Sequence, residues 1–103
     1  MKTMNFADLI ANIDTLPYNT GIYTEMFRWV ASPLEAPLYL SSSDEEQEEG
    51  FDDHIEERGL REFFQLPTLQ DIVEVERRTR PQCTLEDFVA AANYYRQYDT
   101  FRP

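Results

Sequence analysis

The stretch that decides the fold is Thr68–Tyr95, TLQDIVEVERRTRPQCTLEDFVAAANYY. It contains the pattern Thr-x-x-Asp twice, at Thr68–Asp71 and Thr84–Asp87, and each copy opens a segment with apolar residues three or four positions apart. The threonine can accept a hydrogen bond from the third helical amide while the aspartate reaches back, so each pattern predicts a helix start. Pro81 ends the first of these helices. The stretch therefore predicts two helices that pack together at the C-terminal end.

The residues before this stretch predict one more helix and a small sheet. Phe6–Ile13 has the apolar spacing of a helix with one buried side. Ile22–Val30 is rich in β-branched and aromatic residues and predicts a strand, and Leu38–Leu40 predicts a second strand paired with the first. Glu62–Leu66 is either a third strand or an irregular buried segment. The expected fold class is α+β, with a small antiparallel sheet of two to three strands and three to four helices.

Negative charge is concentrated in one part of the chain. The formal net charge is -11, and the segment Asp44–Glu57 holds nine acids and no lysine or arginine. We expect an acidic insertion at about residues 41–58, in which Ser41–Gly50 is a mobile loop and Phe51 and Ile55 begin a weak helical stripe. A concentrated patch of this kind attracts a cationic partner and speeds its association.

The overall composition limits the class of protein. A chain of 103 residues predicts a single domain over residues 1–103. Its acidity disfavours nucleic acids and anionic membranes as partners, because basic side chains dominate such binding. The single cysteine, Cys83, fits a reducing compartment, and no signal peptide or membrane span is evident. We expect a cytoplasmic protein of unknown oligomeric state.

The acidic segment admits three interpretations: a solvated loop, a docking surface for a basic protein, and a calcium loop. The calcium interpretation is weak, because the EF-hand-like frame that starts at Glu45 lacks the usual first aspartate and a preceding helix. For the docking surface, the predicted contacts are six acids and the predicted anchors are three aromatic residues that could be exposed. The acids are Glu45, Glu48, Glu49, Asp52, Asp53 and Glu56, and the aromatic residues are Trp29, Tyr94 and Tyr98.

No catalytic constellation of comparable strength is present. His54 is the only histidine, and Cys83 lies just before a predicted helix start, where a thiol pKa can fall. Neither residue has an evident catalytic partner in the sequence, and there is no Gly-rich phosphate loop or Cys/His zinc spacing. We expect no enzyme activity, no cofactor and no metal, although a small enzyme that uses His54 or Cys83 stays an alternative.

Several segments resemble a family of small acidic bacterial proteins, a domain of unknown function. The resemblance covers the last 35 or so residues well and the first 30 loosely, and Met26–Pro37 and the acidic segment depart from it. The resemblance rests on Gln70–Val73, Pro81–Phe88, Ala92–Tyr95, Asp99, Phe101, Leu16-Pro17 and Ile22-Tyr23. Members of comparable size and charge include immunity proteins encoded beside bacterial toxins, such as those of contact-dependent inhibition systems, so the resemblance implies a toxin inhibitor. It implies no catalytic residue.

These observations favour an immunity or inhibitor protein that neutralises a basic protein, above all a bacterial nuclease toxin. A nuclease site must be positively charged to hold phosphate, and an acidic partner can cover such a site. One alternative is a nucleic-acid mimic that inhibits a restriction or CRISPR-type enzyme. Another is a regulatory module whose acidic segment is only a flexible loop.

Overall fold

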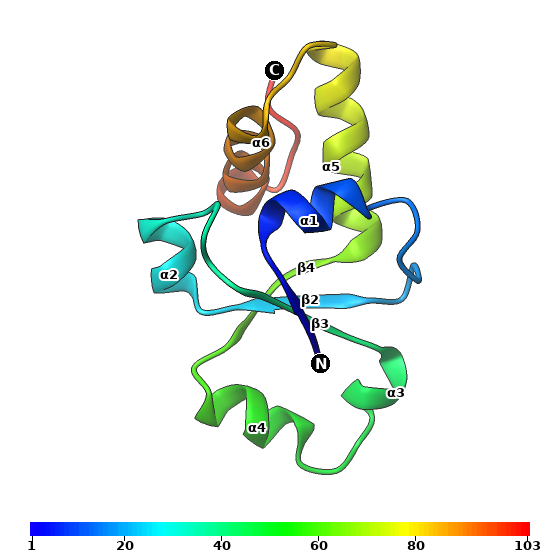
Figure 1. The fold of residues 1–103 in the computed structure, drawn as a ribbon, viewed down its shortest axis with the longest axis vertical. Helices are drawn as coiled ribbons and strands as arrows, with labels where there is room; N and C mark the ends of the chain where they lie inside the picture. Colours follow the sequence, from blue (N-terminus) through cyan, green and yellow to red (C-terminus); the bar gives the residue numbers. More distant parts are fainter. The chain divides into compact units, whose positions relative to one another are not determined.

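The computed structural model describes all 103 residues, which form an α+β fold with a four-strand antiparallel sheet and six helices (Figure 1). Contacts divide the chain into two compact units, Met1–Leu66 (unit 1) and Pro67–Pro103 (unit 2). The prediction of one domain over residues 1–103 stays a prediction. None of the six helices has the length and apolar character needed to cross a membrane.

The elements alternate along the chain. The strands are β1 (Lys2–Met4), β2 (Gly21–Thr24), β3 (Leu38–Ser41) and β4 (Arg61–Gln65). The helices are α1 (Phe6–Ala11), α2 (Met26–Ala31), α3 (Ser43–Glu46), α4 (Phe51–Glu57), α5 (Leu66–Thr79) and α6 (Leu85–Tyr98). The predicted α+β class and antiparallel sheet are confirmed.

The sheet has the order β1-β3-β2-β4, so β2 and β3 are its central strands. Every residue of these two strands is buried, which requires cover on both faces of the sheet. Ile22 lies opposite Leu40, and Tyr23 lies opposite Tyr39. Because side chains alternate along a strand, these two pairs point to opposite faces. In unit 1, α1 lies on one side of the sheet, and α3 and α4 lie on the other (Figure 1).

Aromatic rings form the core on the α1 side. Trp29 is fully buried, with its ring centroid 5.2 Å from that of Phe6 and 4.6 Å from that of Phe63. The pairing of β2 with β4 shifts register between Ile22 and Tyr23. Such a bulge releases the strand from strict alternation, and the neighbouring rings of Phe63 and Phe64 are both buried. Of the two alternatives for Glu62–Leu66, the third strand is therefore confirmed, as β4, although Leu66 already begins α5.

The predicted strand Ile22–Val30 is wrong in its second half. The strand ends at Thr24, and Met26–Ala31 forms the helix α2. Aromatic and β-branched residues also occur in a short helix when one of them packs into the core, and Trp29 packs into the core here. The sequence analysis also missed β1, whose three residues are too few to show alternation.

Unit 2 is a helical hairpin. The guanidinium of Arg77 on α5 lies 5.6 Å above the ring of Phe88 on α6, so the two helices pack together as predicted. Thr84 caps α6 with the predicted reciprocal bonds to Asp87. The cap predicted at Thr68 is wrong, because α5 already begins at Leu66.

Candidate functional site

The acidic segment folds into two short helices. The Ser42 hydroxyl accepts a hydrogen bond from the Glu45 amide at 3.1 Å, and the Glu45 carboxylate accepts one from the Ser42 amide at 3.1 Å. This reciprocal cap starts α3, and Gly50, with a φ of 85°, supplies the left-handed turn before α4. The expectation of a loop over Ser41–Gly50 is therefore wrong for Ser43–Glu46, and the expected mobility stays a prediction. Acids in the first turns of both helices complement the helix dipoles.

Apolar side chains attach α4 to the sheet. Phe51 and Ile55 pack against a buried cluster of Tyr23, Tyr39 and Leu60. The rings of Phe51 and Tyr23 meet edge to face, with centroids 5.7 Å apart. The predicted stripe of Phe51 and Ile55 is thus confirmed, and it holds the acidic helix in place.

A polar network attaches α3. The Ser41 hydroxyl, on β3, donates a hydrogen bond to the Glu46 carboxylate at 2.7 Å. The hydroxyl of Tyr23 also hydrogen-bonds with these two groups, and burial together with the negative charge of Glu46 raises the pKa of Tyr23 to about 12. A Cβ atom at Gly21 would collide with the Glu46 carboxylate, so glycine leaves the space that this carboxylate fills. The network therefore places a negative charge against the end of the sheet.

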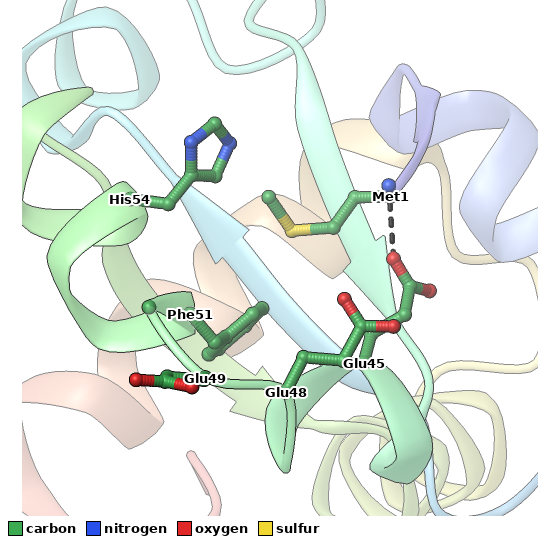
Figure 2. A pocket seen from close by; sticks show the side chains of 7 residues that line it. Met1, Glu45, Glu48, Glu49, Phe51 and His54 are labelled. Carbon is green, nitrogen blue, oxygen red and sulfur yellow. Dashed lines mark ion pairs between the residues drawn. The ribbon is translucent and has the colours of Figure 1, made fainter.

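A pocket of about 270 Å³ lies between β1, α3 and α4 (Figure 2). Its lining consists of Met1, Glu45, Glu48, Glu49, Gly50, Phe51 and His54. The Glu45 carboxylate lies 3.0 Å from the amino group of Met1. Hydrogen bonds from that amino group and from the Ser42 amide hold the pKa of Glu45 below its usual range. The lining includes no lysine or arginine side chain.

A second hollow of about 230 Å³ shares part of this wall. Its lining consists of Glu46, Glu48, Gly50, Phe51, Asp52 and Asp53. The structure thus gathers five of the six predicted contact acids around two adjoining hollows. The sixth, Glu56, is exposed on α4 and lines neither hollow.

The predicted aromatic anchors lie elsewhere. Trp29 is fully buried in the core and is not an exposed contact, which corrects the prediction. Tyr94 and Tyr98 lie on α6 in unit 2, with ring centroids 4.5 Å apart, and Tyr98 is 55% exposed. The sequence analysis missed two exposed residues that flank Trp29, namely Phe27 and Val30. In a helix, the spacing of Phe27 and Val30 places them on the side opposite Trp29. The sequence analysis interpreted the segment as a strand, so it did not find them.

The two residues considered for other chemistry, Cys83 and His54, belong to different units. Cys83 is half-buried in unit 2, whereas His54 lies on α4 in unit 1. No group of three or more His, Cys, Asp or Glu side chains is arranged to hold a metal ion. The segment Glu45–Glu56, which the sequence analysis considered as a calcium loop, forms the end of α3, a turn and most of α4.

The fold and these hollows define a small α+β protein with an acidic surface built on two short helices. A family described as a domain of unknown function (DUF7716) matches residues 3–102, and the chain belongs to this family. This match confirms the predicted resemblance to a domain of unknown function. No curated protein and no solved structure matches the chain.

Proposed function

We propose that the protein is an immunity-type inhibitor that binds a cationic protein, a bacterial nuclease toxin, through the surface of α3 and α4. It acts in the cytoplasm as a binding protein and not as an enzyme. The observation that carries the proposal is the pair of adjoining hollows lined by Glu45, Glu48, Glu49, Asp52 and Asp53. We call this set of residues the acidic surface.

The charge distribution supports this proposal. Unit 1 holds fourteen acids and four lysine or arginine residues, a net charge of -10, whereas unit 2 has six acids and five bases, a net charge of -1. A nuclease must present positive charge where it holds phosphate. The negative charge of unit 1 is therefore complementary to a nuclease active site. Such complementarity raises the rate of association and favours the correct orientation.

The order of the acidic segment supports it too. A disordered acidic loop would lose conformational entropy on binding, and part of the interaction energy would offset that loss. Here the cap at Ser42, the Glu46 network and the packing of Phe51 fix the backbone that carries the acids. The acidic surface is therefore suited to tight binding as well as to long-range attraction.

The same electrostatics would serve a nucleic-acid mimic that inhibits a restriction or CRISPR-type enzyme. A mimic needs carboxylates spaced along a whole face, as phosphates are along a duplex. The acids here gather on two helices of four and seven residues and on the turn between them, which favours one compact contact with a protein.

A pull-down from the source cell's lysate at low salt tests the proposal. Three baits are compared, of which the first is the native chain. The second is the triple variant Glu45→Gln, Glu48→Gln, Glu49→Gln. The third is a matched control with the three substitutions Asp14→Asn, Asp71→Asn, Glu86→Gln. The control residues are exposed, lie outside both hollows and remove the same amount of charge. We expect the native chain and the control to retain one basic protein and the first variant to lose it.

The retained protein is then assayed for cleavage of DNA and RNA with and without the chain. Inhibition by the native chain, and not by the first variant, supports the inhibitor function. Equal retention by all three baits would exclude the acidic surface as the contact. Retention of no basic protein, or of one that the chain does not inhibit, would contradict the proposed function.

A further inference from the structure

The outer face of α2 exposes two large apolar side chains. Phe27 is 72% exposed and Val30 is 75% exposed, and they lie one helical turn apart. An adjoining hollow of about 320 Å³ has a largely apolar floor. Its lining consists of Phe27, Arg28, Ala31, Ser32, Glu35, Ala36 and Pro37. We call this hollow together with Phe27 and Val30 the α2 groove.

The groove is not needed to attach α2 to the core. Trp29, on the opposite side of the helix, makes that attachment through its contacts with Phe6 and Phe63. Five of the six residues of α2 are apolar, so the helix is apolar on nearly all sides. Helices of this kind are normally covered all round. The exposed side of α2 therefore has the character of a contact surface.

Charge decides between the possible occupants of the groove. A second copy would bring another net charge of -11, and anionic lipids or nucleic acids would be repelled in the same way. The lining of the hollow includes one acid, Glu35, and one base, Arg28, and Arg28 is already paired with Glu25 at 3.4 Å. Arg28 therefore leaves the charge of Glu35 uncompensated, and the groove belongs to a unit with a net charge of -10, which complements a cationic protein.

We infer that the α2 groove binds an apolar side chain of the same cationic protein that the acidic surface attracts. This inference rests on the proposed function and adds a second contact to it. The acidic surface sets the rate of association, while Phe27 and Val30 slow dissociation by removing apolar area from water. The anchoring role that the sequence analysis assigned to Trp29 thus passes to its two exposed neighbours.

The test measures association and dissociation rates with the basic protein purified in the pull-down described above. The variant is Phe27→Gln, Val30→Gln, since glutamine keeps helix propensity and both side chains are exposed. The matched control is Tyr18→Gln, which changes an aromatic residue of unit 1 that is 76% exposed and lies outside the groove. Far-ultraviolet circular dichroism and thermal melting verify that both variants fold as the native chain does.

We expect the variant to dissociate about tenfold faster with an association rate within about twofold of the native value. The Tyr18→Gln control keeps both rates, and Glu45→Gln, Glu48→Gln, Glu49→Gln slows association and weakens its salt dependence. An unchanged dissociation rate in the Phe27→Gln, Val30→Gln variant would overturn the inference and leave the proposed function standing.

Two further outcomes overturn the inference in different ways. If sedimentation shows a native dimer that Phe27→Gln, Val30→Gln dissociates, a second copy covers the groove. If the native chain retains no basic protein at all, the proposed function fails and the inference fails with it.

Discussion

The hydroxyl of Tyr23 is held in its neutral form by its surroundings. Burial disfavours the phenolate, and the carboxylate of Glu46 adds a negative charge beside it, so the pKa of Tyr23 rises to about 12. The carboxylate reaches this position because Gly21 has no side chain. Two residues of β2 and one residue of α3 thus depend on one another, and the sequence analysis assigned this role to none of them.

Stability should therefore depend on pH in the alkaline range. Tyr23 is protonated more strongly in the folded chain than in the unfolded chain, so its contribution is fully present below a pH of about 10. It is lost as the pH rises from about 10 towards 12. We expect the free energy of unfolding, measured with urea, to fall over this range. Tyr23→Phe should flatten that fall, whereas Tyr18→Phe, which changes an exposed tyrosine, should keep it.

A change at Gly21 separates the effect of Glu46 on the pKa of Tyr23 from the effects of burial and of the charge of Glu62. The methyl group of Gly21→Ala should displace the Glu46 carboxylate and remove its charge from the hydroxyl. Ultraviolet titration of the folded variant should then give Tyr23 a pKa lower than in the native chain. This pKa should stay above the ordinary value of 10.0, because burial is the larger cause. An unchanged titration would contradict the role assigned to Glu46.

At the scale of single elements, α4 depends on Phe51. This side chain is half-buried, packs on Tyr23 and is the main aromatic contact between α4 and the sheet. Phe51→Ala should cost about 1–2 kcal/mol and release α4, since the other face of the helix is polar. Hydrogen exchange checks this: amide protection should fall in α4 and persist in β2 and β3. Protection that falls equally everywhere would mean that α4 is part of the global folding unit.

The hairpin of unit 2 depends on the buried carboxylate of Glu76. Its side chain is 2% exposed, and it accepts hydrogen bonds from Arg102, near the C-terminus, and from Arg80. Arg102 also pairs with Asp87 at 3.2 Å, so it joins α5, α6 and the C-terminal residues. Removing Arg102 would leave the buried carboxylate with Arg80, which is itself partly exposed, as its remaining cationic partner.

Arg102→Ala should therefore lower the free energy of unfolding by about 2 kcal/mol, because Arg80 still pairs with the carboxylate. The matched control is Arg78→Ala, which breaks an exposed pair with Glu74 on the same helix and should cost less than about 0.5 kcal/mol. Urea unfolding measures both variants. Replacing both members, Glu76→Met with Arg102→Met, should recover part of the loss. Equal costs for Arg102→Ala and Arg78→Ala would show that the carboxylate is not sealed from water.

The elements that the sequence predicted well are those that local chemistry determines. The Thr84 cap and the apolar spacing of α6 need only neighbouring residues, and both are confirmed. The division of Ile22–Val30 into β2 and α2 depends on Trp29 meeting Phe6 and Phe63, which no local pattern encodes. For the same reason the acids of the candidate site were found, while the groove beside Phe27 was missed.

At the scale of the whole chain, the charge is unevenly distributed between the two units. Unit 1 carries -10 of the net charge of -11, and unit 2 is close to neutral. Glu48, Glu49 and Glu57 are exposed, and together with their acidic neighbours they repel one another in the free protein. The acidic surface therefore costs stability in the absence of a partner, and a partner's positive charge would remove that cost.

Salt should reveal this cost without any partner. Raising sodium chloride from about 0.02 M to about 0.5 M shortens the range of the repulsion, so the melting temperature of the native chain should rise by about 2–5 °C. The variant Glu48→Gln, Glu49→Gln, Glu57→Gln should melt higher at low salt and gain less from added salt. The control Asp14→Asn, Asp71→Asn, Glu86→Gln removes equal charge from dispersed positions and should gain nearly as much as the native chain. Equal gains for all three proteins would mean that net charge, and not its concentration between the start of α3 and the end of α4, sets the salt response. In that event a cationic partner would gain no binding free energy by neutralising repulsion among the acids of the acidic surface.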